Sequence, residues 1–151
     1  MLPKNYKGEI KYLEEFKLTD DGGVVKKVIR YGERVGEDAI ALPGQRVVLV
    51  YEARLENGTI VDNWKEHRAN KDVPTTDDGM ILTAGMGEVI DGWDMCVLTM
   101  RLGEKCDCFI NSKYAFGEEG RPPKIPKNAM VIFNIEIIQV GDRKASKPVI
   151  D

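Results

Sequence analysis

Apolar and polar residues alternate along several stretches of this chain, which is the pattern of half-buried β-strands. The clearest case is residues 129–140, where Val131, Phe133 and Ile135 fall on one face and mostly polar residues on the other. Turn-forming residues separate such stretches and indicate antiparallel hairpins. Further strands are predicted over residues 16–18, 24–31, 45–55, 59–62, 80–83 and 105–110.

One stretch has the period of a helix instead. Trp93, Val97 and Met100 follow each other at i, i+4 and i+7, so residues 91–101 are predicted to form a helix with one apolar stripe. Gly103 follows as a stop signal. Strands joined by hairpin turns, with one short helix, predict an antiparallel α+β fold. We expect a twisted half-barrel sheet of about five to six strands wrapped around that helix.

The remaining segments suggest how the chain is organised. Residues 1–31 are expected to form an N-terminal arm, with a short helix near Tyr12 and then a hairpin. Residues 32–140 would form the main domain, and residues 141–151 a flexible tail. Within the domain, residues 63–79 are polar and contain a proline, so we expect a long mobile loop.

A glycosylation acceptor sequence coincides with a turn signal in this domain. Asn57, Gly58 and Thr59 match the acceptor pattern, but Asn-Gly between two apolar runs is also typical of a hairpin turn. The turn is the favoured interpretation, because the first residues contain no apolar stretch of the signal-peptide type.

Composition narrows the class of protein. Hydrophobic residues make up 42% and charged residues 31%, the balance of a soluble globular domain. No apolar run reaches the length of about 18 residues that crosses a membrane. The net charge of −3 gives no electrostatic reason to expect nucleic acid. An odd cysteine count of three favours a reducing compartment, so we expect the cytoplasm, with the nucleus as the alternative.

Two of the cysteines are close enough in sequence to raise the question of a metal site. Cys106 and Cys108 share one face of a predicted strand with Ile110, however, so we interpret them as buried small hydrophobic residues. We expect neither a metal nor a cofactor.

Acid–base and nucleophilic catalysis have little support in the sequence. The chain has a single histidine, His67, in the predicted polar loop, and it lacks nucleophile-elbow and HExxH motifs. A set of aromatic and aliphatic residues with one carboxylate stands out instead, although an ordinary core is the alternative interpretation. The set comprises Tyr51, Val61, Asp62, Met80, Val89, Ile90, Trp93, Phe116 and Phe133.

Several of these residues stand in motifs that together resemble the FKBP-type (immunophilin) peptidyl-prolyl cis-trans isomerase domain. Residues 85–93, ending in Val-Ile-Asp-Gly-Trp, are similar to the start of that family's helix. The Tyr-Ala-Phe-Gly sequence at residues 114–117 resembles the family's Tyr-Ala-Tyr-Gly element. Residues 125–129, with the strand through Phe133, resemble the last part of the family's domain. The resemblance covers residues 44–140 in order.

The resemblance implies a role for each matching position. Trp93 would form the floor of an apolar pocket, Asp62 would accept a hydrogen bond from Tyr51 or from a ligand hydroxyl, and the N–H of Ile90 would hold a ligand carbonyl. The implied catalytic residues are Tyr51, Asp62, Trp93, Phe116 and Phe133, and the implied further pocket residues are Val61, Met80, Val89, Ile90 and Ile125.

Three pocket positions depart from the family pattern, and Cys96 stands where the family has a helix glycine. Val61 and Met80 stand where the family has phenylalanine, and Phe116 stands where it has a tyrosine whose hydroxyl bonds a ligand carbonyl. Phenylalanine at that last position also resembles the weakly active second domain of larger, multidomain members. The resemblance therefore implies a peptidyl-prolyl isomerase of reduced activity, or alternatively a non-catalytic protein-interaction module of a co-chaperone.

The partners implied by the resemblance follow from that function. They are proline-containing peptides or client proteins, a chaperone complex, and tacrolimus or rapamycin bound with weakened affinity.

Overall fold

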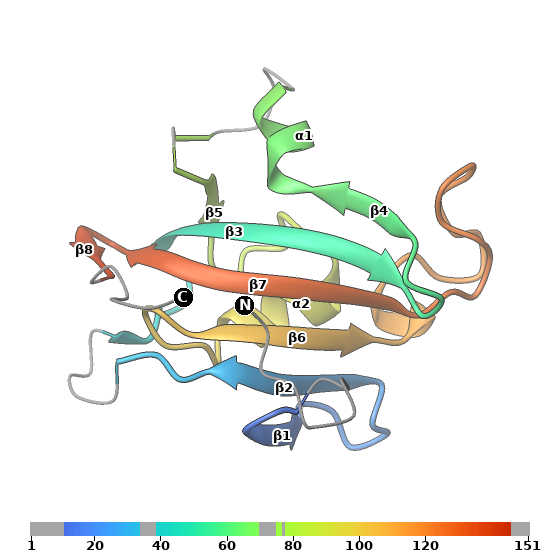
Figure 1. The fold of residues 1–151 in the computed structure, drawn as a ribbon, viewed down its shortest axis with the longest axis horizontal. Helices are drawn as coiled ribbons and strands as arrows, with labels where there is room; N and C mark the ends of the chain where they lie inside the picture. Colours follow the sequence, from blue (N-terminus) through green and yellow to red (C-terminus); the bar gives the residue numbers. More distant parts are fainter. Residues whose placement is uncertain (1–10, 34–38, 70–74, 77, 146–151) are drawn as a thin grey trace.

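The computed structural model describes residues 11–33, 39–69, 75–76 and 78–145. Within this part of the chain, eight strands build one antiparallel sheet (Figure 1). The strands are β1 (Glu14–Lys17), β2 (Val24–Arg30), β3 (Arg46–Leu55), β4 (Ile60–Asn63), β5 (Met80–Thr83), β6 (Lys105–Ile110), β7 (Val131–Val140) and β8 (Arg143–Lys144), and the helices are α1 (Trp64–Ala69), α2 (Asp91–Val97) and the 3₁₀ turn η2 (Ser112–Tyr114).

The sheet has the order β1-β2-β6-β7-β3-β4, with β5 beside β3 and β8 beside β7. The predicted antiparallel α+β fold is confirmed, with more strands than the expected five to six because the N-terminal hairpin joins the same sheet through β2 and β6. In Figure 1, α2 lies against the face of the sheet behind β6 and β7. The division into arm, domain and tail remains a prediction.

The pairing of the two longest strands positions the inner face. β3 and β7 run antiparallel with Tyr51 opposite Ile135 and Ala53 opposite Phe133. Successive side chains of a strand point to opposite faces, so these residues all face the helix side. All four are buried, as the alternation of apolar residues predicted.

Helix α2 covers this inner face with its apolar stripe. Trp93, Val97 and Met100 are all buried, as predicted. The helix ends at Val97, earlier than the predicted residue 101, because the amides of Thr99 and Met100 bond three residues back and the Thr99 hydroxyl donates to the Cys96 carbonyl. Gly92 lets the helix approach β6 closely, since a Cβ there would lie 2.4 Å from a methyl carbon of Ile110.

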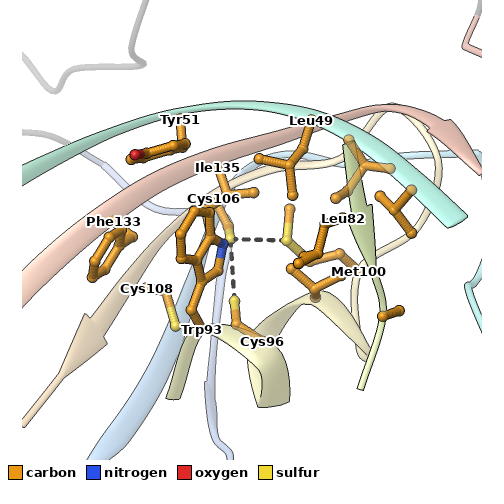
Figure 2. Packing of buried hydrophobic residues seen from close by; sticks show 14 of the residues in the cluster. Leu49, Tyr51, Leu82, Trp93, Cys96, Met100, Cys106, Cys108, Phe133 and Ile135 are labelled. Atoms are coloured by element: carbon orange, nitrogen blue, oxygen red, sulfur yellow. Dashed lines mark hydrogen bonds between the residues drawn. The ribbon is translucent and has the colours of Figure 1, made fainter. Parts of the chain in front are cut away.

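All three cysteines are buried between α2 and the sheet. Cys106 and Cys108 share the inner face of β6 with Ile110, which confirms their interpretation as core residues. The Cys106 sulfur lies 3.7 Å from that of Cys96 and 3.5 Å from the Met100 sulfur (Figure 2). Burial raises the pKa of the Cys106 thiol, which keeps it protonated and unreactive.

The expected short helix near Tyr12 is wrong. Instead residues 11–13 form no helix, and the Leu13 amide donates to the Val28 carbonyl. The Tyr12 hydroxyl donates to the buried Asp107 at 2.6 Å on the outer face of the sheet, and Arg54 also bonds this carboxylate. This long-range contact holds the segment against the sheet, and no local pattern encodes it. Residues 1–10 of the arm lie outside the described residues.

The expected structureless loop over residues 63–79 is partly wrong as well, because it begins with α1. The Asn63 side chain accepts a hydrogen bond from the Glu66 amide and so caps the helix, and Trp64 packs against the core. Residues 70–74 and 77 lie outside the described residues, so the mobility of the loop remains a prediction, and the side chain of His67 is likewise not described.

Two further expectations concern a turn and the tail. The Asn57-Gly58 turn is confirmed, because Gly58 has a φ of +91° and joins β3 to β4. In the tail, β8 pairs with β7, and residues 146–151 lie outside the described part.

Neither of the described helices has the length and apolar character required to cross a membrane.

Candidate functional site

Three aromatic side chains from three elements pack together on the inner face of the sheet. The Trp93 ring of α2 lies 4.6 Å from the Tyr51 ring of β3 and is stacked on the Phe133 ring of β7 at 5.1 Å (Figure 2). Tyr51 and Phe133 are 6.1 Å apart. Each of the three side chains is 3–4% exposed, so they form a closed unit, here called the aromatic floor.

The aromatic floor is tied to a carboxylate. The Tyr51 hydroxyl donates to Asp62 on β4 at 2.7 Å, which is one of the two hydrogen bonds that the family resemblance implied for Asp62. The backbone amide of Asn63 donates to the other Asp62 oxygen at 2.8 Å. Burial, and then the bond to Asp62, raise the pKa of the Tyr51 phenol well above its ordinary value. Tyr51 is therefore a neutral donor at physiological pH.

A cleft of about 340 Å³ opens beside the aromatic floor. Phe133 belongs to both, and five of the predicted site residues line the cleft. Its volume is at the lower end of the range of about 300–1,000 Å³ typical of ligand sites. The lining residues are Ala53, Val61, Asp62, Glu66, Phe116, Arg121, Pro122, Pro123, Lys124, Ile125 and Phe133.

The other five predicted site residues do not line this cleft. Tyr51 and Trp93 lie behind Phe133 in the aromatic floor. Met80 is buried in β5, while Val89 and Ile90 are half-buried and pack against the core just before α2. The Ile90 carbonyl accepts hydrogen bonds from the first amides of that helix.

The rim of the cleft is exposed and charged, unlike its walls. The guanidinium of Arg121 lies 4.9 Å from the centre of the Phe116 ring. Lys124 forms an exposed ion pair with Glu66 of α1 at 3.7 Å. Sequence reasoning missed these three charged residues, because nothing distinguishes them from other loop charges until α1 and the loop face each other. In the sequence, the neighbouring pair Pro122-Pro123 and Ile125 were the features that indicated a site near this loop.

A second cleft of about 310 Å³ lies against the outer face of the sheet. Charged and amide side chains make up most of its lining, including Glu52, Lys105, Asn134 and Glu136, with Trp64 at one side. An apolar cleft with a few polar groups is the more typical small-ligand site, so we favour the inner cleft. Among the residues that the structure describes, no group of three histidine, cysteine or acidic side chains is arranged to hold a metal.

Comparison with known proteins assigns this arrangement to a family. Residues 37–138 match the family model of FKBP-type peptidyl-prolyl cis-trans isomerases. The chain belongs to this family. A fission yeast (Schizosaccharomyces pombe) protein named peptidyl-prolyl cis-trans isomerase is 35% identical over 125 residues, which cover 82% of this chain and 99% of that protein.

Longer FKBP relatives are matched over one part only. The rat (Rattus norvegicus) peptidyl-prolyl cis-trans isomerase FKBP4 is 36% identical over 119 residues, or 79% of this chain. The match spans 23% of that relative, so the chain corresponds to about a quarter of its length.

Solved FKBP structures share the fold. The crystal structure of the three FKBP domains of wheat FKBP73 aligns with a TM-score of 0.66 and 23% identity, covering 83% of this chain and 49% of that one. The isomerase of Pseudomonas syringae pv. tomato aligns with a TM-score of 0.65 and 24% identity, covering 85% and 81% of the two chains. At these identities the likeness establishes the fold alone.

Proposed function

We propose that this FKBP domain is a peptidyl-prolyl cis-trans isomerase whose substrate proline enters the inner cleft. The observation that carries the proposal is the composition of the cleft. Val61, Phe116, Ile125 and Phe133 give it apolar walls. Of the two carboxylates in its lining, Asp62 accepts hydrogen bonds from the Tyr51 hydroxyl and a backbone amide, and Glu66 is paired with Lys124. The membership of the chain in the family supports the same function.

The chemistry requires no acid, base or metal. Resonance across the amide sets the barrier to rotation, and an unaided bond before proline isomerises in tens to hundreds of seconds. Twisting the bond removes that resonance and makes the group less dipolar. A dry apolar cleft therefore favours the twisted state over the planar one, and this difference is what accelerates the rotation.

Each side chain of the site would have a separate role in binding the substrate. The proline ring packs against Phe133 and Ile125, and Trp93 supports Phe133 from behind as the floor of the site. Asp62, held by Tyr51, is available to a backbone N–H or a hydroxyl of the ligand. Stacked, buried rings hold this geometry without rearrangement when a ligand binds.

We propose further that catalysis is weak. Phe116 lacks the hydroxyl that would bond a substrate carbonyl, which costs about 1 kcal/mol of stabilisation. Val61 and Met80 offer less aromatic surface than phenylalanine, which costs about another 1–3 kcal/mol. Together these losses reduce the acceleration without changing its physical basis.

A non-catalytic interaction module is the second candidate, and a specific observation favours it. Trp93 is only 4% exposed and is not among the lining residues, so a ligand in the cleft reaches Phe133 before it reaches Trp93. Such a site can bind a proline-containing client, or tacrolimus and rapamycin, without stabilising the twisted bond. A co-chaperone in the cytoplasm, docked in a chaperone complex, is the corresponding setting.

Exchange NMR on a Leu-Pro peptide separates the two candidates. We expect catalytic amounts of the protein to increase the cis-trans exchange rate, and Ile125→Ala to reduce the increase severalfold because it removes an apolar wall. Ile60→Ala is the matched control, since Ile60 is 47% exposed and is not among the residues that line the cleft. If the peptide binds measurably but its exchange rate does not change, the isomerase is contradicted and the interaction module is supported.

Ligand binding tests the placement of the floor separately. Tacrolimus should alter the tryptophan emission of a Trp64→Phe variant, in which Trp93 is the remaining tryptophan. No change in emission, alongside calorimetry that shows binding, would contradict the position proposed for Trp93.

A further inference from the structure

Arg121 is fixed at the mouth of the inner cleft. Its backbone amide donates to the Ile125 carbonyl at 2.9 Å, and the Ile125 amide donates back at 3.0 Å. Ile125 is buried in the cleft wall, so this pair of hydrogen bonds fixes the backbone of Arg121 next to the site. The guanidinium then lies 4.9 Å from the centre of the Phe116 ring, which restricts the side chain to the cleft side of the loop.

Arg121 differs from the other charged residues in the lining in how it is paired. Asp62 accepts from Tyr51, and Glu66 is paired with Lys124. Arg121 lines the same cleft, yet its guanidinium has no carboxylate within 4 Å among the residues that the structure describes. Among the described residues, the ring of Phe116 is the contact that the structure gives for this cation.

A contact of this kind is compatible with hydrogen bonding by the guanidinium. When a guanidinium stacks on a ring with its flat face, its N–H donors still point outward from the edge. Those donors have the planar, forked geometry that binds both oxygens of a carboxylate. An aromatic support also reduces the side-chain freedom that is lost when the bond forms.

We propose that Arg121 is a specificity-determining residue that selects substrates with a glutamate or aspartate immediately before the proline. The inference rests on the proposed function of the cleft. A proline ring against Phe133 and Ile125 occupies the walls, so the preceding side chain must lie at the mouth. Adjacent residues of an extended peptide are about 3.3 Å apart, which keeps that side chain within reach of a long arginine.

Isomerisation rates for three peptides that differ only before proline test this selection. Exchange NMR would compare Glu-Pro, Gln-Pro and Leu-Pro peptides with the wild-type protein, Arg121→Gln and Arg121→Lys. We expect catalytic efficiency for Glu-Pro to exceed that for Gln-Pro by about two- to fivefold, as for an exposed ion pair. The preference should fall to about one in Arg121→Gln and to an intermediate value in Arg121→Lys, which keeps the charge without the fork.

Lys127→Gln provides the matched control. Lys127 is exposed on the same loop and does not appear in the cleft lining, and its substitution removes the same net charge. We expect the Glu-Pro preference to persist in this variant and, in the wild type, to decrease with added salt. Circular dichroism would confirm that Arg121→Gln folds, as expected for a substitution at an exposed position.

The outcomes separate the two proposals. Wild-type protein that accelerates Leu-Pro but treats Glu-Pro and Gln-Pro alike overturns the role of Arg121 and leaves the isomerase function standing. An equal loss of preference in Lys127→Gln overturns it too, because the effect would then come from net charge. If none of the three peptides is accelerated, the proposed function itself fails.

Discussion

The floor and the rim of the candidate site are built in opposite ways. Tyr51, Trp93 and Phe133 come from three distant elements, are almost fully buried and contact one another. Arg121 and Lys124 come from a single loop and are exposed. The floor is therefore part of the hydrophobic core, whereas the rim is exposed and does not contribute to the core. Substitutions in the floor should affect folding first, and substitutions at the rim should affect only which ligand is bound.

Truncating the floor should have the largest effect. Trp93→Ala leaves a cavity between Tyr51 and Phe133, so we expect the free energy of unfolding to fall by about 3–5 kcal/mol. Urea unfolding followed by circular dichroism measures the change. Arg121→Ala serves as the rim counterpart and should stay within about 0.5 kcal/mol of the wild type. A small loss for Trp93→Ala would mean that the floor is not part of the core.

The cysteines next to the floor should be strongly protected. Cys96, Cys106 and Cys108 are buried, so a thiol reagent reaches them only when the core opens. We expect native labelling to be slower than labelling in denaturant by a factor of about 100 or more. Mass spectrometry of the labelled protein gives both rates. Rapid native labelling, or a stoichiometric zinc ion, would show that this face of β6 is accessible.

The sequence predicts the floor much better than the rim, and the reason is physical. The strands carrying Tyr51 and Phe133 alternate, and the helix carrying Trp93 has a 3.6-residue stripe, so periodicity alone places all three inside. The burial of Cys106 follows from the same alternation.

The rim depends on contacts between segments far apart in sequence. Glu66 and Lys124 are 58 positions apart in the sequence, and their ion pair requires α1. This helix was not predicted because its segment has the polar composition of a loop. The local signal was present, since Asn63 and Glu66 have capping-box spacing. The placement of Tyr12 against Asp107 likewise follows from a tertiary hydrogen bond that no local pattern encodes.

Removing the phenol of the floor should have an effect that depends on pH. Tyr51→Phe deletes the bond to Asp62, and we expect a loss of about 1–2 kcal/mol at neutral pH. The pKa of Tyr51 is raised in the folded state, so its stabilisation is fully present below the unfolded value near 10 and decreases as pH rises above it. The stability difference between wild type and variant should therefore shrink by about 1 kcal/mol between pH 10 and 11.

Urea unfolding of both proteins across that pH range measures the shrinkage. Tyr12→Phe is a useful parallel on the outer face, because burial and Asp107 also raise the pKa of Tyr12. A difference that stays constant with pH would show that Tyr51 ionises equally readily in the folded and unfolded states.

Adding a phenol to the cleft wall next to the rim should change activity and leave stability nearly untouched. Phe116 lines the cleft and lies under Arg121, so Phe116→Tyr adds one O–H donor beside the place where a substrate carbonyl is expected. A well-placed hydrogen bond is worth about 0.5–1.5 kcal/mol, which corresponds to about a two- to tenfold gain in catalytic efficiency or ligand affinity. Exchange NMR with a Leu-Pro peptide and calorimetry with tacrolimus measure the two quantities.

Phe16→Tyr makes the same chemical change on β1, outside the residues that line the cleft, and should give no gain. If Phe116→Tyr gives no gain while the wild type already isomerises efficiently, the cleft does not use this position and catalysis is not weak. If Phe116→Tyr gains affinity for tacrolimus but no turnover, the donor improves binding of the planar and twisted bonds equally. This position of the cleft wall would then determine what binds without contributing to catalysis, which is the behaviour of the interaction module.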